Sequence, residues 1–135
     1  EDVIIINGFD NGAKTYDPGL PMFSDLKYID EKHGYWVKMN QSANLSIHGT
    51  TPANKEINLT KGWNLISYLC DENNNVEYVF NQTMEDVIII NGFDNGAKTY
   101  DPELPMFSDL NSLKPNYGYW VKMNQSSDLD YSNIC

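Results

Sequence analysis

Short apolar runs rich in β-branched and aromatic residues, separated by Asn-Gly and Asp-Pro pairs, recur along this chain. The run "VIIIN" (3–7 and 87–91) is continuously apolar up to an Asn-Gly pair, which is typical of a strand covered on both faces. Each copy holds two Asn-Gly pairs (7–8 and 11–12, 91–92 and 95–96), which predict tight turns with positive φ, and a short "AKTY" strand follows the second pair. In "GYWVKMN" (34–40 and 118–124) apolar and polar residues alternate, which predicts a strand with one buried face.

The segment that follows the first two strands, "DPGLPMFSDL" (17–26), holds two prolines and cannot lie inside a regular strand or helix. Its apolar side chains are expected to pin the loop to the core; they are Leu20, Met22, Phe23 and Leu26. A third, shorter strand is predicted in "ANLSIHG" (43–49) and in "SDLDYS" (127–132).

The middle of the chain has a different pattern. "KEINLTKGWNLISYLC" (55–70) predicts two strands joined through Lys61 and Gly62 as a hairpin. In "NNNVEYVFNQTM" (73–84), Val76, Val79 and Phe80 fall at positions i, i+3 and i+4, which predicts one short helix at about 76–84.

A repeat organises these elements. Residues n and n+84 are identical at 35 of the 47 pairs between Glu1/Glu85 and Ile47/Tyr131, without a gap. The differences gather in 27–33 against 111–117, which we interpret as an exposed connection. Recent duplication is the simplest cause of the identity, and a shared binding surface is the alternative.

The repeat divides the chain into a partial unit A (1–49), a connecting segment B (50–84) and a unit A′ (85–135). Segment B and A′ together are expected to form one complete module of about 55–132. The predicted fold class is mainly β, a β-rich α+β fold. It consists of small antiparallel sandwich or barrel-like units with one short helix, one unit complete and one partial.

Charge narrows the classes of partner. Nineteen Asp and Glu against nine Lys, with no Arg, give a formal net charge of -10. A polyanionic surface repels phosphate backbones and anionic headgroups, so nucleic acid is not an expected partner. No apolar run approaches the ~20 residues of a membrane span, so no membrane insertion is expected.

Two kinds of residue bear on the compartment. Cys70 and Cys135 lack the spacing of a zinc site and form a candidate disulfide. Five Asn residues begin Asn-x-Ser/Thr triplets, a modest excess that fits a glycosylated, secreted surface but also follows from an Asn-rich composition. These candidate acceptors are Asn40, Asn44, Asn58, Asn81 and Asn124.

The ordered motifs "GWNLIS" (62–67), "YDP" (100–102) and "GYW" (118–120) resemble a tandem β module of secreted and surface-layer proteins of archaea and bacteria. The match covers 57–131 as one full module, and 1–49 matches only its later two thirds. The resemblance implies an extracellular or cell-surface accessory module, involved in adhesion or surface architecture, without established catalytic residues. Leu69 and Cys70 replace the usual Pro after the first strand, so this strand is expected to run longer or to be bonded covalently through Cys70.

The partial unit A poses a physical problem, because without the Gly-Trp-Asn-Leu-Ile-Ser strand it leaves unpaired backbone groups and uncovered apolar residues. Three solutions stay open. A and A′ share the single segment B in one compact domain, A accepts a strand from another molecule, or A is an open end left by excision from a longer array.

Trp36 and Trp120 are candidate ligand-binding residues. Alternation places them opposite the apolar Tyr-Val-Met face of their strands, and exposed aromatic rings near Asn and Asp suit stacking on sugar rings. The alternative is that a loop or a second layer covers each ring.

An acidic loop is the candidate metal site. Asp71, Asn73, Asn75 and Glu77 place oxygen ligands two residues apart, as in a calcium loop, although the Gly and the distal Glu of the helix-loop-helix site are missing. Four further Asp residues are second-choice candidate ligands after this group: Asp10, Asp17, Asp94 and Asp101. No other cofactor is expected.

Catalysis is not expected. His33 and His48 are replaced by Tyr117 and Ser132 in A′, and Cys70 has no neighbouring His in the sequence. The first hypothesis is therefore a non-catalytic extracellular structural or interaction module, with a protein partner or self-association by strand exchange. The second is a carbohydrate-binding module that uses the two tryptophans on a polysaccharide.

Overall fold

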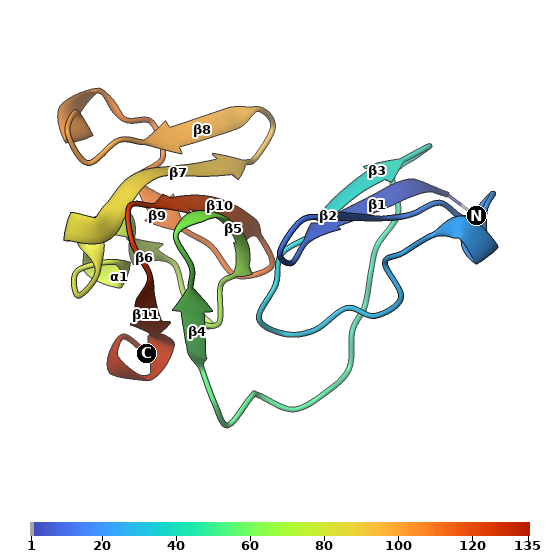
Figure 1. Cartoon of the computed structure of the whole chain (residues 1–135), viewed down its shortest axis with the longest axis horizontal. Helices are drawn as coiled ribbons and strands as arrows, with labels where there is room; N and C mark the ends of the chain where they lie inside the picture. The colour runs from blue at the N-terminus through green and yellow to red at the C-terminus, as the bar shows by residue number, and fades with distance from the viewer. Residues whose placement is uncertain (1) are drawn as a thin grey trace.

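A computed structural model describes residues 2–135 and consists of two units, one for each copy of the repeat (Figure 1). The first unit holds three strands and a 3₁₀ helix: β1 (Val3–Phe9), β2 (Ala13–Tyr16), η1 (Pro21–Phe23) and β3 (Trp36–Met39). Residues 40–55 then run to the second unit without regular structure.

The second unit holds the remaining strands and the single α-helix of the described residues. Its elements are β4 (Glu56–Leu59), β5 (Gly62–Ser67), β6 (Asn74–Asn75), α1 (Val76–Val79), η2 (Met84–Asp86), β7 (Val87–Phe93), β8 (Ala97–Tyr100), η3 (Pro105–Phe107), β9 (Ser112–Leu113), β10 (Gly118–Met123), β11 (Ser127–Asp130) and η4 (Tyr131–Asn133). All strand pairs are antiparallel and the sheets are open, so the mainly β fold class is confirmed.

The sheets of the two units correspond strand by strand. The first has the order β2-β1-β3, and the second has the order β5-β10-β7-β8, where β7, β8 and β10 repeat the sequences of β1, β2 and β3. The second unit adds the two-stranded sheets β4-β11 and β6-β9. Strand β5 is therefore the element of the larger sheet that the first unit lacks.

Of the two Asn-Gly pairs predicted as turns in each copy, the second is confirmed, whereas the first (7–8 and 91–92) lies inside β1 and β7. Asn11 and Gly12 have φ of 57° and 134°, and Asn95 and Gly96 have φ of 55° and 134°. Asn and Gly are the residues that tolerate this left-handed backbone, so each turn can join its two strands directly.

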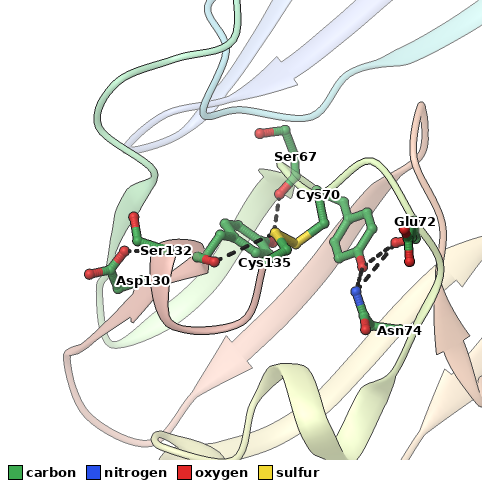
Figure 2. The surroundings of a disulfide bond; sticks show 9 residues. Ser67, Cys70, Glu72, Asn74, Asp130, Ser132 and Cys135 are labelled. Atoms are coloured by element: carbon green, nitrogen blue, oxygen red, sulfur yellow. Dashed lines mark hydrogen bonds between the residues drawn. A yellow bond between two sulfur atoms is a disulfide. The ribbon is translucent and has the colours of Figure 1, made fainter.

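The main hydrophobic core lies in the second unit, and its buried members run from Ile57 to Tyr131. The Tyr131 hydroxyl is fully buried and donates a hydrogen bond to the Ser67 carbonyl oxygen (2.8 Å), and burial raises the pKa of this phenol. Cys70 and Cys135 form a disulfide that ties the end of the chain to the segment after β5 (Figure 2). The second unit thus has its own core and its own covalent closure.

Segment B differs from its prediction in two ways. The helix is one turn long instead of about nine residues, because the buried Thr83 hydroxyl bonds to Ser127 of β11 and the chain turns there. The expected hairpin is not formed: β4 pairs with β11, whereas β5 pairs with β10. Gly62, with φ of 94°, redirects the chain from one sheet to the other.

Two predictions for the repeated strands are also wrong. Strands β1 and β7 are not covered on both faces, since Ile4 and Ile88 are exposed. The third strand forms as β11 in the second unit, but residues 43–49 form no strand in the first. The reason is that β11 is held by β4, which has no counterpart in the first unit.

Removing the disulfide should destabilise the second unit strongly. The cystine joins residues 65 apart, and the chain-entropy relation gives a loss of about 4 kcal/mol for a loop of this length. We expect the double variant Cys70→Ala/Cys135→Ala to lose this free energy of unfolding in denaturant titration, while amide exchange in β1 and β2 stays unchanged. A loss below about 1 kcal/mol would contradict this role of the cystine.

Candidate functional site

Strand β3 exposes side chains whose counterparts are buried in the second unit. Val37 is 45% exposed, whereas Val121 of β10 is fully buried. Met39 is 36% exposed, whereas Met123 is 1% exposed. Since both strands have the sequence "WVKM", the difference comes from the surroundings and not from the residues.

Among residues 2–135, no strand pairs with the backbone of β3 on one of its two sides. In the order β2-β1-β3 it is the edge strand, and all four of its residues are exposed. In the second unit β10 is flanked by β7 and β5. We call the exposed apolar face and free edge of β3 the open sheet.

Apolar side chains outside β3 are also uncovered in the first unit. Ile29 is 62% exposed, whereas its counterpart Leu113 of β9 is fully buried beside β6. Leu45 is 81% exposed, whereas Leu129 of β11 is 2% exposed beside β4. Each uncovered position therefore corresponds to a missing partner from segment B.

The two units meet through a reciprocal aromatic contact. Phe9 lies edge-on to Trp120, with ring centroids 5.3 Å apart, and Trp36 lies edge-on to Phe93, with centroids 5.2 Å apart. Phe9 and Phe93 occupy equivalent positions in the repeat, as do the two tryptophans. Such an exchange of equivalent contacts is the mark of a two-fold, isologous interface, here within one chain.

Two glycines lie where the pseudo-two-fold axis passes. A Cβ atom added to Gly34 would lie 3.2 Å from the Cα of Gly118, and one added to Gly118 would lie 3.1 Å from the Cα of Gly34. The Gly34 N–H also donates to the Leu65 carbonyl oxygen of β5 (3.1 Å). Glycine at both positions lets the two backbones meet.

The window in which the copies differ has a structural role that the sequence analysis missed. In the first unit, the Lys32 carbonyl oxygen accepts a hydrogen bond from the Ser67 N–H (3.3 Å), at the outer edge of β5. In the second unit, the equivalent window forms β9 and pairs with β6. The two windows have different partners, and the clustering of differences at 27–33 was the signal for this.

A turn supports this contact. The Asp30 carboxylate accepts hydrogen bonds from the N–H groups of Lys32 (2.9 Å) and His33 (3.1 Å), and its Oδ1 lies 2.8 Å from the His33 Nδ1. Burial alone raises the pKa of Asp30, but these hydrogen bonds outweigh it and hold the pKa below its usual value.

The structure places both candidate tryptophans at the junction of the units. Trp36 is 40% exposed and contacts Phe93, while Trp120 is half-buried between Phe9 and Trp63, whose ring centroid lies 5.9 Å away. Both rings thus have aromatic neighbours. In β10, the half-buried Trp120 alternates with buried Tyr119 and Val121, as the sequence predicts, whereas all four residues of β3 are exposed.

The candidate calcium ligands are partly engaged elsewhere. The Asn75 side-chain oxygen caps α1 by accepting from the Glu77 N–H (2.8 Å), and the Glu77 carboxylate accepts from the Tyr100 hydroxyl (2.8 Å). Burial and this carboxylate raise the pKa of Tyr100 to about 12. Asp71 and Asn73 lie in an exposed loop.

The four further aspartates do not converge on one site. Asp17 and Asp101 accept hydrogen bonds within their own loops, from Gly19 and Glu103, and Asp94 pairs with Lys114. Within residues 2–135, no three His, Cys, Asp or Glu side chains are close enough together to hold a metal ion. All five candidate glycosylation asparagines are exposed.

A second apolar feature was predicted wrongly. Met22 and Phe23 do not pin their loop to the core but are 85% and 84% exposed, and Met106 and Phe107 of the other copy are 90% and 84% exposed. Leu26 alone is buried as expected. The prolines force a 3₁₀ turn, and its backbone bonds turn the Met-Phe pair outward.

Comparisons with protein-family models, with curated proteins and with solved structures find no match for this chain.

The matched valines offer a direct test of the open sheet. Val121→Ala should lower the free energy of unfolding by about 2 kcal/mol, because it leaves a cavity in a closed core. Val37→Ala should change it by less than about 0.5 kcal/mol, because the side chain is half in solvent. Equal losses in denaturant titration would show that Val37 is covered in solution.

The glycine contact can be tested by its effect on β5. In Gly34→Val the new Cβ would lie 2.8 Å from the Ile66 carbonyl oxygen, so the units must separate. We expect faster amide exchange at Ser67, whose N–H bonds to Lys32, with the second-unit core unchanged. Gly49→Val is the control, since a Cβ there meets nothing within 4 Å. Unchanged exchange in Gly34→Val would mean that the units are not docked.

Proposed function

We propose that this chain is a non-catalytic structural and interaction module of a secreted or cell-surface protein, and that it associates with protein partners through the open sheet. The observation that carries the proposal is the contrast between equivalent side chains, such as Val37 at 45% exposure and Val121 at 0%. One copy is a closed, disulfide-bonded unit, and the other presents the same face to solvent.

The energetics favour association at this face. Fully burying a Val or Met side chain contributes about 1.5–3 kcal/mol relative to leaving it exposed. The free N–H and C=O groups along the edge of β3 are a template on which another strand can pair. The apolar face therefore provides binding energy for a partner, and the unpaired edge beside it sets the register in which a partner strand pairs.

Two observations support an extracellular location for the module. The Cys70–Cys135 disulfide suits an oxidising compartment, and the five exposed Asn-x-Ser/Thr asparagines are accessible to glycosylation. The net charge of -10 disfavours nucleic-acid partners. No helix within residues 2–135 is long and apolar enough to cross a membrane.

Carbohydrate binding is the second candidate. It is favoured by the partly exposed Trp63, which lines a cleft between the units together with Asp10 and His33, and by the partial exposure of Trp36. It ranks second because Trp36 already contacts Phe93, so a sugar ring has to share the indole with this contact. Polysaccharide retention that Trp36→Ala abolishes, with self-association intact, would favour it.

Sedimentation equilibrium tests the first candidate. We expect the weight-average mass of the chain to rise above the monomer value of 15.4 kDa with concentration, because two open sheets can pair weakly. Val37→Lys should remain monomeric. Met106→Lys, which places the same charge on a side chain that is 90% exposed, should behave as the wild type. A wild-type chain that stays monomeric at millimolar concentration would contradict the proposal.

A further inference from the structure

We infer that the open sheet is a docking site for one kind of partner, a segment of the B type that has the pattern of residues 56–84, with the strands β4 and β5 followed by a short helix, and that is carried by another module. The inference rests on the proposed function and specifies its partner. The second unit shows what such a segment does when it is seated on the equivalent sheet.

Within the second unit, segment B pairs with β10 along the whole length of this strand. Strand β5 pairs with β10 at six successive positions, from Gly118 opposite Ser67 to Met123 opposite Gly62. Behind it, Val76, Val79 and Phe80 are buried in the same core as Val121. Edge and face are thus covered by one continuous piece of chain.

The identity of the two strands fixes the expected register. Because 34–39 and 118–123 have the same sequence, a docked segment should place its Ser opposite Gly34, its Leu opposite Trp36 and its Gly opposite Met39. A slip by one residue would turn its buried side chains outward, so the register is specific.

Docking should also order the chain beside β3. Leu129 of β11 lies opposite Ile57 of β4, and the equivalent Leu45 lies in a segment without regular structure. A docked segment brings a second β4, which supplies the missing neighbour. Residues 43–46 are then expected to become a strand.

A second copy of this chain cannot supply the segment without loss. Residues 1–135 hold one B segment for two copies of the repeated sheet, so exchange of this segment between two such stretches covers one open sheet and uncovers another. Pairing of two open sheets with each other covers the edge but brings no helix. The face is therefore fully covered only by an additional B-type segment.

The position beside β3 is also compatible with the pseudo-two-fold arrangement. Strand β5 fits between β10 and residues 32–34 of the first unit, where its outer edge is bonded to Gly34 and Lys32. The reciprocal Phe-Trp contacts relate the two units by a pseudo-two-fold axis, and this axis makes the edge of β10 that β5 occupies equivalent to the free edge of β3. A docked segment would complete the symmetry of the pair.

Fusion of the segment to the full chain provides the test. A second copy of residues 50–84 is placed directly before Glu1, which reproduces the junction between Met84 and Glu85, with Ser in place of Cys70 in the added copy. We expect amide exchange at Trp36–Met39 to slow by about 100-fold, and new protection at 43–46, as local opening becomes unfavourable. The fusion should also lose the self-association of the parent chain.

Matched controls separate docking from a general effect of the extension. Val37→Lys in the fusion should abolish the protection, and Met106→Lys should not. An added segment with Asp in place of the residues equivalent to Leu65 and Ile66 should give none. A labelled 56–84 peptide added to the full chain, followed by anisotropy, should bind saturably with the same sensitivity to Val37→Lys.

The outcomes distinguish the inference from the function on which it rests. If the parent chain self-associates through Val37 but neither the fusion nor the peptide protects β3, the partner is not a B-type segment and the inference fails while the proposed function stands. If there is neither self-association nor protection, both fail. Protection that persists in Val37→Lys would place the segment elsewhere and overturn the inference.

Discussion

The pairing of β5 with β10 is the interaction on which the closed unit depends. It brings Leu65 and Ile66 onto the sheet and positions the helix and β4 that follow and precede it in the chain. Where this pairing is present, the sequence "WVKM" is part of a core; where it is absent, the same letters form an exposed edge. Burial here is decided by a non-local partner and not by local preference.

The two copies separate what is encoded locally from what is not. The hairpin of β1 and β2, its Asn-Gly turn and the added third strand β3 form in both copies, with or without segment B. The strand at 127–130 and the short pairing of β9 with β6 form only where segment B supplies the partner. An isolated strand gains too little from propensity to offset its loss of backbone entropy.

The sequence therefore predicted the strands better than their pairing. Alternation and turn residues identified β1, β2, β3 and β5, because these signals are local. The partner of β4 was predicted wrongly, since a Lys-Gly turn between two strands fits both a hairpin and a crossing between sheets.

The Met-Phe pairs of η1 and η3 were predicted to lie in the core, because a sequence pattern shows that a residue is apolar but not the direction in which a 3₁₀ turn points its side chain. The reciprocal Phe-Trp contact depends on the relative placement of the units, which a pattern along one strand does not contain.

An open apolar sheet is a hazard for aggregation, and the chain limits it by charge and shape. Strand β3 is only four residues long and carries the exposed Lys38 in its middle, two devices that weaken pairing with arbitrary strands. The net charge of -10 adds a repulsion between copies. A B-type segment overcomes both because it contributes a matching register and an apolar helix at once, whereas an arbitrary strand contributes the backbone bonds alone. The open sheet is thus selective because covering it requires both a strand in matching register and an apolar helix, and only a B-type segment supplies the two together.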